Sequence, residues 1–535
     1  MSSLPPAVRW PRAFAALALV LVLELLALQG GSHATATPVA SHPGRAVEAI
    51  VRFDAGVPAA RGRAVLRAHG ATVTRDLHLI NGFGARLAAG GAAALAHEPE
   101  VAAVTLNSSV ATTAVDAGAQ LDGPGALDGD GPVAALDGLD SAFVQSTRTD
   151  HLWARTGSTG QGIRVAVLDT GVAGDAVDFT NRDGSSRVVA TAVTNPDATD
   201  DEDHVGHGTH VAGLVAGNSS VRPRSDALRN QHFGTAPGSD IVSVKVSDDA
   251  GATSVLDVIY GLQFAVDHAK RYRIRVVNLS LSALDPGDPA TDPLDAAVDA
   301  AWLHGLVVVA AAGNRGSADD AVDYAPGNDP FAITVGAVDD QGTKSTGDDA
   351  LTSWSSRGTT QDGTAKPDVV APGAHVVSVL APDSDYAARC PACVTGDGQY
   401  LRLGGTSSAA PIVAGIAADL IALHPGWTPD QVKGALTSTL RHTADGRGQE
   451  VDASRADRAR GARLTANADA VPSQLIDPAT GDIDPTRASW SRASWSRASW
   501  SRASWSCDCA GLIGDAAQPV RASWSRASWS SSFTK

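Results

Sequence analysis

Three short segments of this chain carry side chains that could together hydrolyse a peptide bond. Asp169 begins an Asp-Thr-Gly triplet, His207 begins a His-Gly-Thr-His segment, and Ser407 ends a Gly-Thr-Ser triplet. In such a set the serine hydroxyl attacks the carbonyl, the histidine takes its proton, and the aspartate orients the histidine. We therefore predict that Asp169, His207 and Ser407 are catalytic residues.

The elements around these residues must bring them together. Ser407 precedes a long apolar run and is predicted to open a buried helix over 407–423, where free N–H groups and the helix dipole favour a developing oxyanion. Thr406 or Ser407 could also serve only as a helix cap. The Asp169 and His207 segments favour the catalytic interpretation over this alternative.

Asp169 and Asn314 each follow an apolar run predicted to be a buried strand, 163–168 and 307–312. Open α/β sheets place their ligand crevices at the carboxyl ends of such strands. The side-chain amide of Asn314 could donate to the oxyanion, although an asparagine after glycine is often only a turn residue. We predict Asn314 as the oxyanion-hole donor.

A parallel sheet with flanking helices is predicted for one large α/β domain over residues 141–470. Its apolar runs lack polar alternation, which is typical of strands buried on both faces. The predicted strands are 163–168, 241–246, 276–281, 307–312, 333–338 and 376–380. The predicted helices are 205–216, 255–270, 293–304, 407–423 and 429–439.

Residues 46–113 form a separate unit with the predicted order βαββαβ, which is the ferredoxin-like arrangement. Its predicted elements are a strand at 47–53, a helix at 59–70, a strand pair around 77–87, a helix at 92–97 and a strand at 101–104. The alternative interpretation of this unit is a small α+β binding module.

The chain resembles the subtilisin family of serine endopeptidases across residues 46–470. The catalytic motifs already named carry this resemblance, together with the oxyanion segment 312–314 and the supporting segments 234–237 and 366–373. The unit 46–113, especially its Leu-Ile-Asn-Gly-Phe segment 79–83, resembles the family's inhibitory propeptide. The resemblance implies a self-processing zymogen inhibited by its own propeptide, with no cofactor needed for the chemistry.

Two departures from the family pattern accompany this resemblance. Ser282 and Ala283 stand where the family usually has two glycines that leave room for substrate backbone, which leaves the width of the cleft open. Ser408 stands where the family usually has a methionine directly after the nucleophile.

Two alternatives belong to other classes. A non-catalytic surface-binding protein could retain the fold, but all three catalytic residues are present. An acid peptidase of the same fold would carry glutamate in place of His207.

Composition favours a secreted protein. Residues 1–36 have basic Arg9 and Arg12, an apolar stretch and a small-residue cleavage site, which together indicate a signal peptide; a membrane anchor is the competing interpretation. The net charge of -16 argues against nucleic-acid binding.

Low-complexity segments flank the two units. An Asp/Gly-rich linker is predicted at 114–140 and a second linker at 471–486. Residues 487–535 repeat Arg-Ala-Ser-Trp-Ser, and we predict a basic tail that is not a packed domain and could attach the protein to a cell surface.

The four cysteines are Cys390, Cys393, Cys507 and Cys509. In an exported chain they favour disulfides over a zinc site, and the sequence leaves the pairing open. The spacing of His204, His207 and His210 could suggest zinc, but the catalytic role of His207 speaks against it. The family often binds structural calcium, and the acidic run 197–203 could contribute ligands, although most such runs are solvated loops.

Overall fold

The computed structural model describes residues 46–115, 141–460, 466–467 and 470–473. Its first unit has the predicted βαββαβ order. The elements are β1 (Val47–Phe53), α2 (Ala59–Ala68), β2 (Thr72–Leu77), β3 (Gly82–Leu87), α3 (Gly91–Ala96) and β4 (Val101–Leu106). The strand order β2-β3-β1-β4 is ferredoxin-like, with β1 antiparallel to both β3 and β4.

The prediction of a strand pair within 77–87 was wrong in its first half. β2 ends at Leu77, and residues His78–Ile80 form a 3-10 turn that leads into β3. Leu79 and Ile80 are buried in this turn because they pack into the same hydrophobic core as the larger domain. Their tertiary contacts, which local sequence does not reveal, override strand propensity here.

The large domain is built on a sheet ordered β22-β23-β18-β14-β13-β11-β7-β9-β8, in which neighbours from β23 to β8 are parallel. β15 (Ala350–Leu351) pairs with β14 off this path. The strands are β7 (Arg164–Asp169), β8 (Val188–Val193), β9 (Asp240–Lys245), β11 (Ile274–Leu279), β13 (Val307–Ala311), β14 (Ile333–Asp339), β18 (Val369–Pro372), β22 (Arg441–His442) and β23 (Gln449–Glu450). The predicted parallel sheet is confirmed.

Two of the predicted strands differ in their placement. The run 376–380 forms β19 (Val376–Val379), which pairs antiparallel with β21 (Tyr400–Gly405) in a separate small sheet with β20 (Val394–Thr395). The run 276–281 divides into β11 and β12 (Leu281–Ala283), and β12 leaves the large sheet to pair elsewhere. An apolar run indicates burial, but it does not specify which strand lies beside it.

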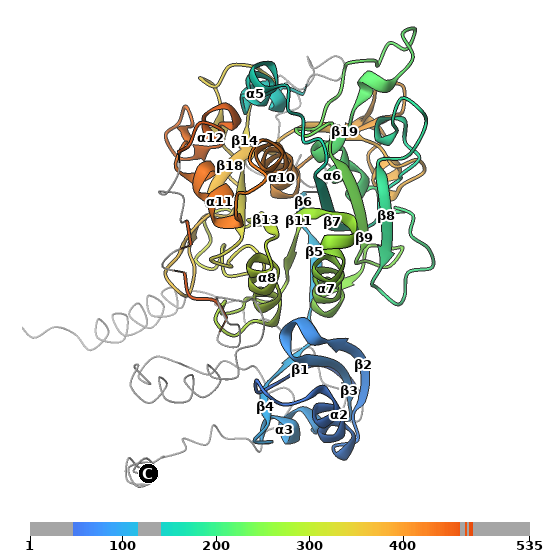
Figure 1. The fold of residues 1–535 in the computed structure, drawn as a ribbon, viewed down its shortest axis with the longest axis vertical. Helices are drawn as coiled ribbons and strands as arrows, with labels where there is room; N and C mark the ends of the chain where they lie inside the picture. The colour runs from blue at the N-terminus through green and yellow to red at the C-terminus, as the bar shows by residue number, and fades with distance from the viewer. Residues whose placement is uncertain (1–45, 116–140, 461–465, 468–469, 474–535) are drawn as a thin grey trace, which may run out of the picture. The chain divides into compact units, whose positions relative to one another are not determined.

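Helices cover both faces of the sheet. α6 (His207–Ala216) and α10 (Thr406–Leu423) pack against each other, whereas α7 (Val255–Tyr272) and α8 (Pro293–Leu303) pack together on the other face (Figure 1). The remaining helices are α4 (Phe143–Ser146), α5 (Thr149–Thr156), α9 (Asp385–Arg389), α11 (Pro429–Thr437) and α12 (Ala453–Ala456). Among the described helices α10 is long and apolar enough to cross a membrane, but 89% of it is buried, as in a core helix.

Several predictions lie outside the described residues. These are the signal peptide at 1–36, most of the linker at 114–140, the second linker at 471–486 beyond Ser473, the repeat tail at 487–535, and Cys507 and Cys509.

Candidate active site

Asp169 and His207 form a buried hydrogen-bonded pair. Asp169 is the last residue of β7, and His207 is the first residue of α6. The distance between Nδ1 of His207 and Oδ1 of Asp169 is 2.7 Å, and each side chain is 1% exposed. This bond fixes the ring so that Nε2 is the atom available to a nucleophile.

A second carboxylate, Asp203, holds the beginning of α6 in place. It accepts hydrogen bonds from Thr170 Oγ1, next to Asp169, and from the Gly206 N–H, just before His207. It also accepts from the N–H and Oγ1 of Thr209 in the first turn of α6. Burial raises the pKa of Asp203, and these hydrogen bonds act in the opposite direction. Asp203 thereby links the Asp169 strand to the His207 helix.

The three histidines that suggested zinc do not converge. His207 bonds to Asp169, and Nε2 of His210 lies 3.2 Å from the carbonyl oxygen of Val376. Burial and the neighbouring His207 lower the pKa of His210 to about 3, so it is neutral at physiological pH. His204 pairs with Asp200 at the surface.

Ser407 is the second residue of α10 and is buried. Gly405 precedes the helix with a φ of 138°, a backbone conformation that L side chains rarely adopt. Among the residues that the structure describes, the Oγ of Ser407 has no hydrogen-bond partner, so it is not bonded to His207. The first turn of α10 therefore presents a hydroxyl without a partner.

Asn314 follows β13 and is oriented by Thr406. Its Oδ1 accepts from both the N–H and the Oγ1 of Thr406, each at 3.0 Å. Its Nδ2 donates to the carbonyl oxygen of Thr113 at 2.6 Å. Because Thr406 occupies the acceptor atom, the amide donor faces the Thr113 carbonyl.

The segment 109–115 lies across this site as an extended chain. β5 (Ser109–Thr112) pairs antiparallel with both β10 (Thr253–Ser254) and β12. The N–H of Thr113 donates to the carbonyl oxygen of Ser280, and β6 (Ala114–Val115) pairs with Gly404 and Gly405 of β21. The peptide bond between Thr113 and Ala114 thus lies between Asn314 and the start of α10.

Ser282 and Ala283 stand where the family usually has two glycines, and an extended chain still pairs with them. Ser282 pairs with Ala111, and Ala283 pairs with Val110, in regular antiparallel register. Side chains on a strand point to alternate faces, away from the hydrogen-bonding edge. Serine and alanine at these positions therefore do not close the cleft to backbone pairing.

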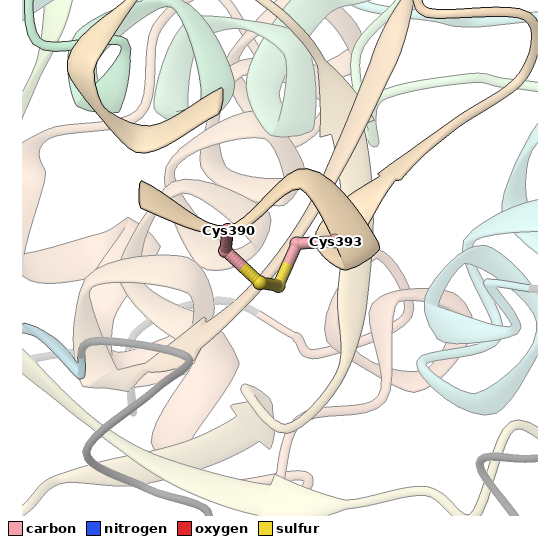
Figure 2. Close-up of a disulfide and its surroundings, with 2 residues drawn as sticks. All are labelled: Cys390 and Cys393. Carbon is pink, nitrogen blue, oxygen red and sulfur yellow. A yellow bond between two sulfur atoms is a disulfide. The ribbon is translucent and has the colours of Figure 1, made fainter. Parts of the chain in front are cut away.

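The segment from Asp385 to Cys393 lies beside His207. The N–H groups of Asp385 and Tyr386 donate to the carbonyl oxygens of His204 and Val205, and the Tyr386 ring lies 6.1 Å from the His207 ring, edge to face. Cys390 and Cys393 form a disulfide that closes the turn after α9 (Figure 2). This bond resolves the pairing of these two cysteines, which the sequence leaves open.

Within the described part of the chain, one group of side chains has a geometry that could hold a metal ion, namely Asp200, His204 and Asp249. The buried ammonium of Lys245 lies within this group, 2.6 Å from Asp249 Oδ1 and 3.5 Å from Asp200 Oδ1. Calcium prefers six to eight oxygen ligands, whereas this group offers a histidine nitrogen and is already neutralised by lysine. These residues do not fit a calcium ion.

Sequence reasoning missed the roles that four residues play at this site: Asp203, Ser280, Thr406, which orients Asn314, and Tyr386. Asp203 was placed in an acidic run expected to be solvated, yet it is 5% exposed. The N-cap of α6 is Gly206, so Asp203 lies outside the usual capping position, and its role was not evident from the local sequence. The roles of Ser280 and Tyr386 depend on distant contacts that carry no local signal.

The comparisons with known proteins agree with this geometry. Residues 160–464 match the family model described as "Peptidase_S8: Subtilase family". Serine protease AprX of Bacillus subtilis (strain 168) is 37% identical over 280 residues, a match covering 51% of this chain and 60% of that protein. Subtilisin of Bacillus pumilus is 35% identical over 289 residues, covering 54% of this chain and 86% of that protein.

A solved structure shares the fold. Fervidolysin from Fervidobacterium pennivorans, described as a keratinolytic enzyme related to subtilisin, has a TM-score of 0.58 and 23% sequence identity, covering 78% of this chain and 61% of that one. The matches thus span about 60% of the length of both AprX and fervidolysin.

Proposed function

The chain belongs to the subtilase family of serine proteases, and from this premise we propose that it is a secreted endopeptidase made as a self-processing zymogen. Its catalytic residues are Asp169, His207 and Ser407, with Asn314 as the oxyanion donor. The observation that carries this proposal is the 2.6 Å hydrogen bond from Asn314 to the carbonyl oxygen of Thr113. A non-catalytic surface-binding role is not favoured, because all three proposed catalytic residues are present and His207 is hydrogen-bonded to Asp169.

Acylation begins with the Oγ of Ser407, which attacks the carbonyl carbon of the substrate while His207 accepts its proton at Nε2. Asp169 holds the histidine through Nδ1 and stabilises the imidazolium that forms. His207 then donates the proton to the leaving amine, and an acyl-enzyme on Ser407 remains. Water, activated by the same histidine, releases the acyl group. No step requires a cofactor, and calcium has no assigned ligands in this proposal.

The oxyanion is stabilised by groups that are fixed before substrate binds. Nδ2 of Asn314 is directed by the two Thr406 bonds, and the N-terminus of the 18-residue helix α10 adds the positive end of its dipole. Preorganised donors stabilise charge that develops in the transition state without the cost of reorienting at that moment.

Self-processing is proposed at the bond between Thr113 and Ala114. Residues 109–113 occupy the cleft as a substrate would, in antiparallel pairing with β10 and β12. Cleavage there would separate the propeptide, residues 46–113, from the peptidase domain, residues 141–470, with the linker 114–140 left for removal.

The propeptide is held by contacts that would outlast the cleavage and so inhibit the enzyme. Asn107 Oδ1 accepts from the N–H of Leu256 in the first turn of α7, and the carbonyl oxygen of Ser108 accepts from the N–H of Val255 in the same turn. Gln263 on the same helix accepts from the N–H of Leu79 and donates to the carbonyl oxygen of Asp76. The intramolecular partner is therefore the chain's own first unit.

The test is labelling of secreted protein with a serine-reactive phosphonate. The wild-type enzyme should be labelled once, on Ser407, and the Ser407→Ala variant not at all. Labelling of both proteins to the same extent would contradict the assignment of the nucleophile.

Peroxide resistance is a further expected property. The chain has one methionine, Met1, and Ser408 replaces the family's oxidisable methionine beside the nucleophile. Methionine sulfoxide would place a polar oxygen close to the oxyanion site. Under dilute hydrogen peroxide, the Ser408→Met variant should lose activity much faster than the wild type. Equal rates of loss in the two proteins would show that position 408 does not set oxidative sensitivity.

We also propose that the repeat tail at 487–535 attaches the protein to the cell surface. Its arginines and tryptophans could contact an anionic, carbohydrate-rich surface through charge and ring stacking. Truncation after Asp484 should leave kcat/KM unchanged and move protein from the cell surface to the medium, measured by activity in each fraction. Identical partitioning of the full and truncated chains would exclude this role.

A further inference from the structure

A pocket lies next to Thr113, the residue whose carbonyl Asn314 binds. It is lined by Ala111, Thr112, Thr113, Ser282, Leu284, Asn314 and Arg315 and has a volume of about 170 Å³. Ala111 and Thr113 share one face of the extended segment because side chains alternate along a strand. This volume is additional to the space that the Thr113 side chain fills. The pocket can therefore accommodate a longer side chain at position 113.

Arg315 is the charged residue in the lining of this pocket. Its backbone N–H donates to Ser356 Oγ, and its guanidinium carbon lies 3.5 Å from the centre of the Tyr324 ring. The hydroxyl of Tyr324 in turn donates to Asp320. Among the described residues, no carboxylate lies within ion-pair distance of Arg315. The guanidinium is therefore stacked on an aromatic ring without an ionic partner.

A planar guanidinium presents parallel N–H donors that match the two oxygens of a carboxylate. A glutamate side chain at the Thr113 position would carry its carboxylate into the pocket while its methylene groups pass Leu284. A lysine or arginine at this position would instead meet a like charge, which disfavours binding.

We propose that Arg315 makes this enzyme prefer to cleave after acidic residues, glutamate foremost. The inference rests on the proposed function, since it assigns the substrate class of the same site. The chain's own Thr113 does not conflict with it, because an intramolecular segment reaches the cleft at high effective concentration and needs no favourable side-chain contact.

The test uses the mature wild-type enzyme and peptides with the chain's own residues 110–112, Val-Ala-Thr, followed by one varied residue and a fluorogenic leaving group. Glutamate and glutamine differ in charge and hardly in shape, so their kcat/KM ratio isolates the effect of the carboxylate. We expect a ratio of about tenfold or more in favour of glutamate, as for a hydrogen-bonded ion pair, and a larger ratio for glutamate over lysine.

Two variants at position 315 test whether Arg315 causes the preference for glutamate. Arg315→Gln should bring the glutamate-to-glutamine ratio close to one, and Arg315→Glu should reverse the order of glutamate and lysine. Arg271→Glu is the matched control, because Arg271 also stacks on a tyrosine, Tyr272, but lies far from the cleft on α7. It should leave every ratio unchanged.

The outcomes separate this inference from the proposed function. If no peptide is cleaved, the proposed function itself fails. If peptides are cleaved but the wild-type glutamate-to-glutamine ratio is one or less, the acidic preference is wrong, whatever the variants do. A wild-type preference that persists in Arg315→Gln would overturn the role of Arg315.

Discussion

Replacing Ser407 with alanine is expected to lower kcat for peptide hydrolysis by about six orders of magnitude, because the whole triad acts through this one hydroxyl. The change removes one oxygen atom that has no hydrogen-bond partner among the described residues, so the fold should persist. Hydrolysis of casein by protein purified from a protease-deficient host measures the effect.

The same variant should accumulate as an uncut precursor that retains residues 46–113. Ser408→Ala is a matched control, since it makes the same chemical change one residue further along the same buried turn. This control should mature normally. If the Ser407→Ala precursor were cut after Thr113 in a host without other proteases, self-processing would be refuted.

Replacing Asn314 with alanine should lower kcat by roughly 10²–10³, or about 3–4 kcal/mol of transition-state stabilisation, with KM little changed. The reason is that Nδ2 contacts the carbonyl oxygen on which negative charge develops. Steady-state kinetics on a soluble peptide measure both constants.

Asn314 also binds Thr406, so a second variant must separate the two roles. Asn314→Asp keeps an acceptor oxygen for Thr406 but replaces the amide donor with a second oxygen. Its kcat should fall at least as far as that of Asn314→Ala, because a carboxylate repels the oxyanion. If Asn314→Asp retained the wild-type kcat, the contribution of Asn314 would be positional and not that of an oxyanion donor.

Much of the fold is predictable from local sequence. The runs before Asp169 and Asn314 are apolar without alternation, and this pattern indicates strands buried on both faces, which occur in parallel sheets. The position of Ser407 at the start of a buried helix follows from the small residues before it and the apolar run after it. These features depend on neighbours in the chain, so the local sequence is enough to predict them.

Which distant groups come into contact depends on the three-dimensional packing of the chain. Asp203 belongs to an acidic run that is hydrophilic in composition, and it is buried only because Thr170 and the first turn of α6 supply four hydrogen-bond donors from two segments. The run 376–380 became an antiparallel strand because β21 lies beside it, and apolar composition does not encode a partner.

The three residues proposed as catalytic were predictable from sequence because their chemistry restricts the residue types that can serve. Substrate preference was not, since it depends on how a pocket closes around a side chain. Arg315 follows Asn314 directly in the chain, and nothing local indicates where its side chain points. Only the tertiary packing brings Arg315 against Tyr324 and into the lining of the pocket beside residues 111–113.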